Sequence, residues 1–214
     1  MSNNVINNYQ SIQDNINKAK NSNVKIISVS KTFSMDTIMP LIKHGVIHFG
    51  ENKVQEAEVK WKDIKTSDIK LHMIGKLQSN KAKKALEIFD YIHSLDSQKL
   101  ADILDVNQKR IKKNLNYFIQ VNVGLEKQKN GISPGEIDQF YTYCTKELNL
   151  NIVGLMAIPP NDGKEEKHFN FLYESNASLG LKELSMGMSA DYLKALKYNS
   201  TFLRIGSAIF GTRS

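Results

Sequence analysis

The sequence has few of the residues that make covalent cross-links, and it has no long apolar run. Its 214 residues include one cysteine, which excludes an internal disulfide, and only four prolines. No stretch reaches the roughly 18 uninterrupted apolar residues that a membrane helix needs. The first twenty residues lack a basic start followed by an apolar block, so we expect no secretory signal. These absences predict a cytoplasmic protein that does not enter a membrane.

Patterns of metal ligands are absent as well. There is no Cys/His cluster, and no two of the five histidines stand four residues apart on one helix. His48, His72 and His93 fall within predicted strands, and His72, which begins the "HMIG" motif, could reach the interior of a barrel. His44 and His168 are expected at the surface. We therefore predict no metal site.

The net charge of +7 raises the question of a nucleic-acid partner. The basic residues are mostly lysines on predicted helices, as in "KAKKALE" and "QKRIKKN", beside acidic residues and without interleaved aromatics. A groove binder stays possible as an alternative, but solvated helix faces explain this pattern better. The sequence predicts no nucleic-acid partner.

Short apolar runs alternate with helical patterns along the whole chain. Apolar residues at positions 5, 9, 12, 16 and 19 predict an N-terminal helix. The strands are predicted at residues 24–30, 46–49, 70–74, 90–94, 117–123, 151–156, 183–186 and 201–205. Eight strands alternating with helices in this length predict an α/β fold, a (β/α)8 TIM barrel over a single domain of residues 1–214.

In such a barrel the active groups gather at the C-terminal ends of the strands. Lys31 ends the first strand, in "VKIISVSKTF". The seventh strand runs into "SMGMSAD", where Ser189 is placed to cap the next helix, and the eighth runs into "RIGSAIFG", where Gly206 and Ser207 open a helical turn. The last two segments are either ordinary capped turns or a phosphate-binding site.

The position of Lys31 favours a phosphate-binding site over ordinary capped turns, because the first and eighth strands become neighbours when a barrel closes. An amine beside a phosphate site suggests a phosphate ester with an aldehyde, held as a Schiff base. Pyridoxal 5'-phosphate (PLP) is the obvious candidate.

Six motifs then carry a resemblance to a known family. "SVSKT", "FGENKVQE", "HMIGKLQSNK", "GLMAIPP", "LSMGMSADY" and "RIGSAIFG" occur in this order, and with them about residues 5 to 212 resemble the pyridoxal phosphate homeostasis proteins. These are single-domain relatives of the N-terminal barrel of alanine racemase. The resemblance implies an internal aldimine on Lys31. It also implies a set of cofactor-binding residues around that lysine: Asn52 and Met188 near the ring, Arg204 at the pyridine nitrogen, and Ser189, Gly206 and Ser207 at the phosphate.

The sequence departs from the family pattern at three positions. Lys53 stands where the family commonly has tyrosine, which would alter the mouth of the pocket. Asn199 replaces a usual glycine, and Ser207 replaces a usual threonine while keeping its hydroxyl.

The resemblance implies a non-catalytic role as an intracellular PLP carrier that passes the cofactor to apo-enzymes. We expect a monomer, because the second domain that makes the dimer contact of the racemase relatives is not expected here. Arg204 can only donate a hydrogen bond, which favours an unprotonated pyridine nitrogen and a weaker electron sink. The alternative is a PLP-dependent amino-acid racemase or lyase, which would need a further acid/base group. The racemase relatives take a tyrosine from a second domain, which we do not expect here. A barrel without cofactor, acting as a scaffold, is the third hypothesis.

Other reactive side chains fit packing roles. Tyr141, Tyr143 and Tyr192 fall on helical patterns rather than at strand ends, and Cys144 lies on the apolar stripe of its helix. We expect none of them to be catalytic. The loop "NDGKEEKH" after the sixth strand is either a solvated connector or a docking surface.

Overall fold

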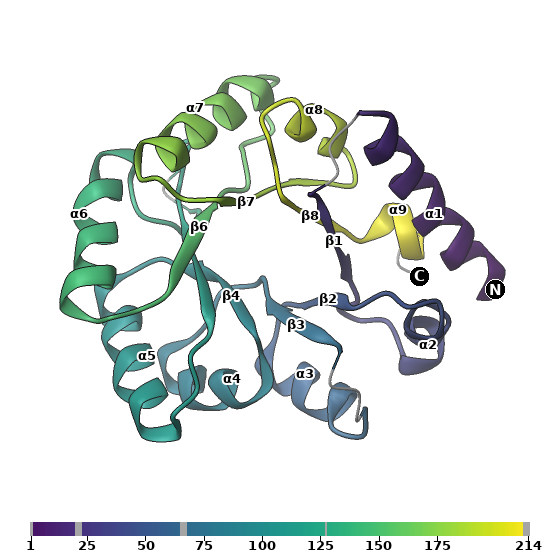
Figure 1. Ribbon diagram of the computed structural model, residues 1–214, viewed down its shortest axis with the longest axis horizontal. Helices are drawn as coiled ribbons and strands as arrows, with labels where there is room; N and C mark the ends of the chain where they lie inside the picture. The colour runs from purple at the N-terminus through teal and green to yellow at the C-terminus, as the bar shows by residue number, and fades with distance from the viewer. Residues whose placement is uncertain (1, 20–22, 65–67, 127, 212–214) are drawn as a thin grey trace.

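The chain forms a closed ring of parallel strands with helices around it (Figure 1). The computed structural model describes residues 2–19, 23–64, 68–126 and 128–211. Within these residues each strand pairs with the next one along the chain. The eighth strand pairs with the first, in a register that places Lys25 opposite Phe202. The predicted (β/α)8 barrel with its N-terminal helix is confirmed. The predicted single domain over 1–214 includes positions outside the described residues.

Each strand overlaps one of the predicted ranges. The strands are β1 (Lys25–Val29), β2 (His48–Glu51), β3 (Lys70–Met73), β4 (Tyr91–Leu95), β5 (Asn116–Gln120), β6 (Ile152–Met156), β7 (Glu183–Met188) and β8 (Phe202–Ile205). β2 begins later than predicted because the Val46 N–H still bonds the carbonyl of Leu41 in the preceding helix. β5 ends earlier than predicted because, although the Val121 N–H still bonds the Met156 carbonyl of β6, Val121 forms a separate bridge with Ile132.

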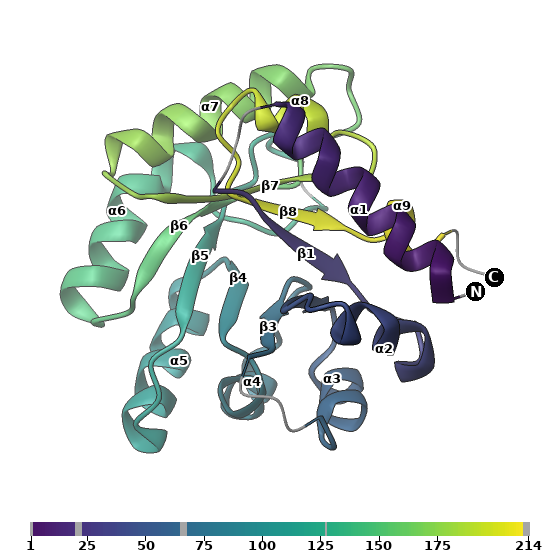
Figure 2. The ribbon, with the colours of Figure 1, turned by 45° about the vertical axis from the view of Figure 1, so that its right-hand side comes forward.

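The helices pack on the outside of the barrel (Figures 1 and 2). They are α1 (Ser2–Lys18), α2 (Met35–Lys43), α3 (Val54–Trp61), α4 (Ala82–Ile88), α5 (Gln98–Ile111), α6 (Ile137–Thr142), α7 (Glu165–Ser178), α8 (Tyr192–Leu196) and α9 (Ser207–Phe210), with 3-10 turns η1 (Ser79–Lys81) and η2 (Pro134–Glu136) and a π-helical turn η3 (Tyr143–Glu147). α1 packs against α2 and α9, and Asn8 Nδ2 donates to the Ile209 carbonyl across 2.9 Å. This contact joins the first helix to the last.

The apolar side chains form two cores. The larger one lies between the strands and the surrounding helices. The smaller one contains Ile27, Phe118, Met156 and Phe202. Strands of a parallel barrel are covered on both faces, which explains why they appear in the sequence as nearly continuous apolar runs.

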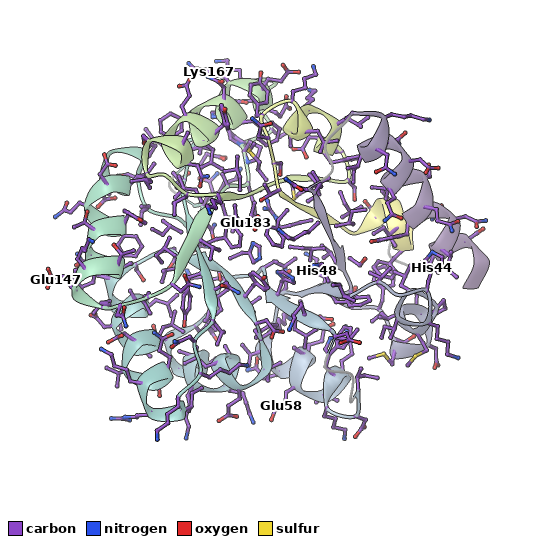
Figure 3. The ribbon with its side chains drawn as sticks, viewed as in Figure 1. His44, His48, Glu58, Glu147, Lys167 and Glu183 are labelled. Carbon is purple, nitrogen blue, oxygen red and sulfur yellow. The ribbon has the colours of Figure 1, made fainter. Side chains whose placement is uncertain are left out.

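Histidine side chains lie beside the smaller core. His72 and His93 are fully buried, and Phe202 lies against the rings of both. Figure 3 shows His48 and Glu183 near the centre of the ring, whereas Glu58, Glu147 and Lys167 lie at its periphery. Cys144 is buried in the larger core, which confirms its packing role. Among the described residues, no helix is both long enough and apolar enough to cross a membrane.

Candidate functional site

One cavity of about 550 Å³ contains all seven residues predicted to hold the cofactor. They are Lys31, Asn52, Met188, Ser189, Arg204, Gly206 and Ser207. The remaining lining residues are small or apolar: Val29, Phe33, Ile74, Ile158, Ala190 and Gly211. The volume falls within the range of about 300–1,000 Å³ that is typical of small-molecule sites. The sequence therefore located the residues that meet in this cavity, and their contacts show how the fold positions them.

The residue before Lys31 is fixed from outside the barrel. The buried Ser30 hydroxyl donates to Glu51 Oε1 at 2.7 Å, and Lys60 Nζ donates to the Ser30 carbonyl at 2.8 Å. Trp61 Nε1 donates to the same carboxylate oxygen at 3.1 Å. Burial raises the pKa of Glu51, against the charge of Lys60, which lowers it. Ser30 thus has its backbone and its side chain held by residues of β2 and α3.

The residue after Lys31 is held from the same helix. Thr32 has φ of 69°, a left-handed conformation that is strained for a β-branched residue. Its N–H donates to Glu56 Oε1, and Lys60 Nζ binds the same oxygen at 2.8 Å. Burial acts to raise the pKa of Glu56, but the hydrogen bonds from Lys60 and Thr32 outweigh it and lower the pKa. Lys60 therefore contacts the groups that hold both sequence neighbours of Lys31. We call Glu51 of β2 together with Glu56 and Lys60 of α3 the α3 clamp.

Two glycines bring other parts of the cavity together. A Cβ on Gly75 would lie 2.4 Å from the carbonyl oxygen of Asn52, so only glycine allows the chain after β3 to pass this closely. Gly187, within β7, has φ of 91°, and a Cβ there would lie 2.7 Å from Ala195 Cβ. The backbone at Gly187, where the pairing of β7 with β8 shifts register, directs Met188 and Ser189 to the cavity.

Arg204 enters the cavity from the barrel interior. It is 4% exposed, and its Nη1 donates to Ser185 Oγ at 2.7 Å while its Nη2 donates to the Ala157 carbonyl at 2.8 Å. Burial lowers the pKa of Arg204 to about 10, so the guanidinium is still protonated near neutral pH. A charge buried this deeply needs its hydrogen-bond partners, and these two hold it in one orientation.

The prediction that Ser189 caps the helix after β7 is wrong. Ser189 Oγ instead accepts hydrogen bonds from the N–H groups of Gly206 and Ala208, each at 3.2 Å. Asp191 fixes its own turn, because its Oδ1 accepts the Met188 N–H at 2.6 Å. Ser189 therefore joins the loop after β7 to the loop after β8, and α9 begins at Ser207 as the sequence indicated.

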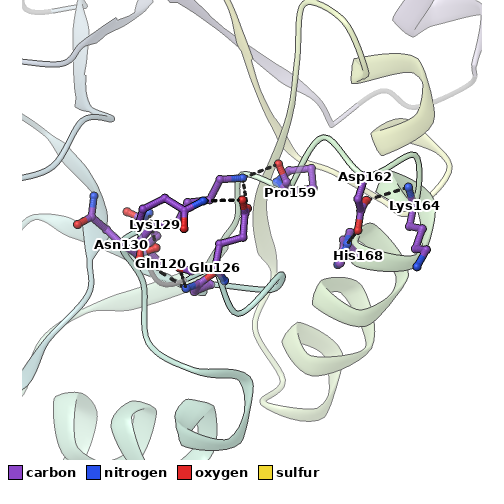
Figure 4. Close-up of polar contacts among 10 residues, drawn as sticks. Gln120, Glu126, Lys129, Asn130, Pro159, Asp162, Lys164 and His168 are labelled. Atoms are coloured by element: carbon purple, nitrogen blue, oxygen red, sulfur yellow. Dashed lines mark hydrogen bonds and ion pairs between the residues drawn. The ribbon is translucent and has the colours of Figure 1, made fainter.

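The loops after β5 and β6 are also fastened to each other (Figure 4). Lys129 Nζ pairs with Glu126 Oε2 at 2.5 Å and donates to the Pro159 carbonyl at 3.2 Å. Pro159 directly follows Ile158, which lines the cavity. Further along the chain, His168 of α7 pairs with Asp162 of the preceding loop at 3.0 Å, and it is half-buried, more than its predicted surface position implied.

The other flagged positions lie away from the cavity lining. Lys53 is exposed, so its substitution for tyrosine does not change the lining itself. Asn199 has φ of 56°, a left-handed conformation that asparagine tolerates better than most residues, which explains how it can replace glycine. Tyr192 is buried and accepts a hydrogen bond from Asn15, while Tyr141 and Tyr143 pack against the larger core.

Several residues with a role at the site had no signal in the sequence. The α3 clamp acts from outside the barrel, and Ser185 lies within a strand rather than at its end. The four-residue spacing of Glu56 and Lys60 predicts a helical ion pair but not its contact with Lys31's neighbours. Among the described residues, no group of His, Cys, Asp and Glu side chains is arranged to hold a metal ion.

Known proteins resemble the chain over nearly its whole length. Residues 2–214 match the family model described as the alanine racemase N-terminal domain. The "pyridoxal phosphate homeostasis protein" of Pasteurella multocida is 38% identical, over 95% of this chain and 94% of that protein. The chain belongs to the pyridoxal phosphate homeostasis protein family.

Two further family members extend the comparison. The homeostasis protein of Haemophilus influenzae is 38% identical, over 99% of this chain and 97% of its own length. The solved structure of PipY from Synechococcus elongatus with PLP bound is 32% identical, covers 97% of this chain and all of that one, and superimposes with a TM-score of 0.87. A PLP-bound family member thus has the same fold along its full length.

Proposed function

We propose that this protein binds PLP at the cavity between the C-terminal ends of its strands and takes part in PLP homeostasis inside the cell. The names of the relatives and the PLP bound to PipY support this proposal. The observation that carries it is the composition of the cavity lining. Lys31, Arg204 and two serine hydroxyls line it, and among the described residues it has no carboxylate.

This set of groups fits PLP. A lining with cations and no carboxylate suits an anionic ligand, and Ser189, Gly206 and Ser207 stand together at the loops after β7 and β8, where they could hold its phosphate. The side chains of Ile74, Ile158 and Met188 offer apolar contacts for a ring. PLP supplies an aldehyde, and we propose that the Lys31 amine condenses with it, releasing one water, to give an internal aldimine.

The same lining favours a carrier over a catalyst. Racemisation or elimination needs an acid/base group besides the lysine, and histidine, cysteine, tyrosine and carboxylates are the usual ones. None of these lines the cavity among the described residues. Arg204, protonated near neutral pH, can donate but not accept a proton. We therefore propose that the protein stores PLP and releases it to apo-enzymes.

The test is the visible absorption spectrum after PLP is added and the excess removed. We expect a yellow band in the wild type that borohydride bleaches, and no such band in Lys31→Ala. Lys53→Ala is the matched control, because Lys53 is an exposed lysine outside the cavity lining, and it is expected to behave as the wild type. A wild type that stays colourless would refute the proposal.

Catalysis is tested separately with D- and L-amino acids. We expect no turnover above the rate of free PLP. A rate above that level which Lys31→Ala abolishes would replace the carrier by the racemase or lyase. Transfer is tested by adding a PLP-dependent apo-enzyme to the loaded protein and following the recovery of its activity.

A further inference from the structure

A continuous chain of hydrogen bonds runs through the barrel interior and ends at Arg204. His48 Nδ1 lies 2.9 Å from His72 Nε2, and His72 Nδ1 lies 2.9 Å from His93 Nε2. His93 Nδ1 lies 2.9 Å from Ser185 Oγ, which accepts the bond from Arg204 Nη1. We call the three imidazoles the histidine column. It joins residues of β2, β3 and β4 to the strand opposite, β7.

The direction of these bonds follows from Arg204. A guanidinium has no acceptor, so Arg204 donates to Ser185 and leaves that hydroxyl with its own proton to place. His93 Nδ1 is the other partner of Ser185 among the described residues, so the hydroxyl donates to it. A neutral imidazole that accepts at Nδ1 carries its proton at Nε2.

The same rule then applies to each ring in turn. His93 Nε2–H donates to His72 Nδ1, and His72 Nε2–H donates to His48 Nδ1. All three histidines therefore hold the Nε2–H tautomer, and every bond points away from Arg204. The reverse direction would give Ser185 two donors and leave its hydroxyl proton without an acceptor among the described residues.

The surroundings keep the column neutral and ordered. His72 and His93 are 0% exposed, and burial lowers the pKa of each well below its usual value. His72 stacks on Tyr91 with ring centroids 4.4 Å apart, and His93 stacks on Phe118 at 4.2 Å. A neutral imidazole has one donor and one acceptor, and in His72 and His93 both are used.

We propose that Ser185 and the histidine column are positioning residues for Arg204. The column allows the Ser185 hydroxyl only the orientation that presents a lone pair to Arg204. The guanidinium is then fixed at Nη1 by Ser185 and at Nη2 by the Ala157 carbonyl, while the residue still lines the cavity. The part that concerns PLP rests on the proposed function; the orientation of Arg204 does not.

The first experiment is nitrogen NMR of the PLP-free protein labelled in histidine and arginine. We expect three Nε2–H imidazoles, and separate Nη resonances for Arg204 because both of its Nη atoms are bonded. In Ser185→Ala the Nη resonances are expected to merge. In Ser94→Ala, the matched control, they stay separate, because the Ser94 hydroxyl is equally buried and has no partner among the described residues. An Nδ1–H tautomer in the column, or unchanged Arg204 resonances in Ser185→Ala, would overturn the proposal.

The second experiment measures PLP affinity and the absorption maximum of the bound form. Ser185→Ala is expected to bind at least about tenfold more weakly, the lower end of what a lost charge-assisted hydrogen bond costs, and to shift the maximum. Ser185→Thr, which keeps the hydroxyl, is expected to restore both. Wild-type affinity and spectrum in Ser185→Ala would refute the positioning role. A wild type that takes up no PLP would refute the proposed function instead, and the NMR result would still decide the orientation of Arg204.

Discussion

Acid should destabilise this protein well above the pH at which carboxylates titrate, because of the histidine column. Burial lowers the pKa of His72 and of His93 well below the ordinary value, and it lowers that of His48 to about 4. In the unfolded chain a histidine takes up a proton near pH 6.5. Folding then requires that proton to leave. The contribution of the neutral histidines to the free energy of unfolding is therefore fully present above about pH 6.5 and is lost as the pH falls below that value.

The size of the effect follows from the two fully buried rings. For each ring that stays neutral in the folded state, a change from about pH 7.5 to pH 5 costs about 2 kcal/mol. His72 and His93 together should cost about 4 kcal/mol, a large share of the roughly 5–15 kcal/mol typical of a whole domain. His48 is half-buried and acts in the same direction with a smaller effect. Glu51 acts oppositely, because burial raises its pKa and its protonation favours the folded state.

The assay is urea unfolding at a series of pH values from about 8 to 5, with the free energy of unfolding plotted against pH. Near pH 5.5 the slope should correspond to about two to three protons taken up on unfolding, and His48→Gln should reduce it by up to one. A slope below one proton would show that the column is already charged in the folded protein. It would refute both the stability argument and the neutral tautomers on which the positioning of Arg204 rests.

Three further predictions concern other parts of the fold. Lys60→Met leaves the buried Glu51 carboxylate without its cation, so we expect about 3 kcal/mol less stability in urea unfolding and weaker PLP binding, and unchanged binding would contradict the role of the α3 clamp. Gly187→Ala should cost about 2 kcal/mol from backbone strain and overlap, and lower PLP affinity, whereas Gly135→Ala, where a Cβ meets nothing, should do neither. Burial raises the pKa of the Cys144 thiol to about 12, so a thiol reagent should react with it only as fast as the protein unfolds, and fast labelling of the folded protein would show that the thiol is accessible.

The fold could be predicted from the sequence because each strand of a parallel barrel is covered on both faces and is therefore rich in apolar residues. The runs around Ile27, Phe118 and Leu155 therefore stand out without alternation. The boundaries were less certain, since apolar character does not reveal where a backbone hydrogen bond goes. Val46 is as apolar as a strand residue, but its N–H belongs to the end of α2.

The seven cavity residues could be predicted because the barrel brings the ends of its strands together and because six motifs resemble a family. The residues that hold these seven in place could not be predicted from the sequence, for two reasons. The partner of Ser189 depends on how close two loops approach, which no local pattern specifies. The histidine column forms because three neighbouring strands each point one histidine inward, at successive levels along the barrel axis. These levels follow from the register in which the strands pair, which the sequence does not show.

The two charged groups of the site are held by different parts of the protein. Lys31 is positioned from outside the barrel, through Ser30 and Thr32, by charged residues of β2 and α3. Arg204 is positioned from inside, through Ser185, by neutral rings. The outer clamp is an ion-pair cluster close to solvent, with Lys60 10% and Glu56 27% exposed, so salt should weaken it. The inner column carries no net charge and two of its three rings are fully buried, so salt should leave it unchanged while acid disrupts it. Salt is therefore expected to affect the position of the Lys31 amine and acid that of the Arg204 guanidinium, each independently of the other.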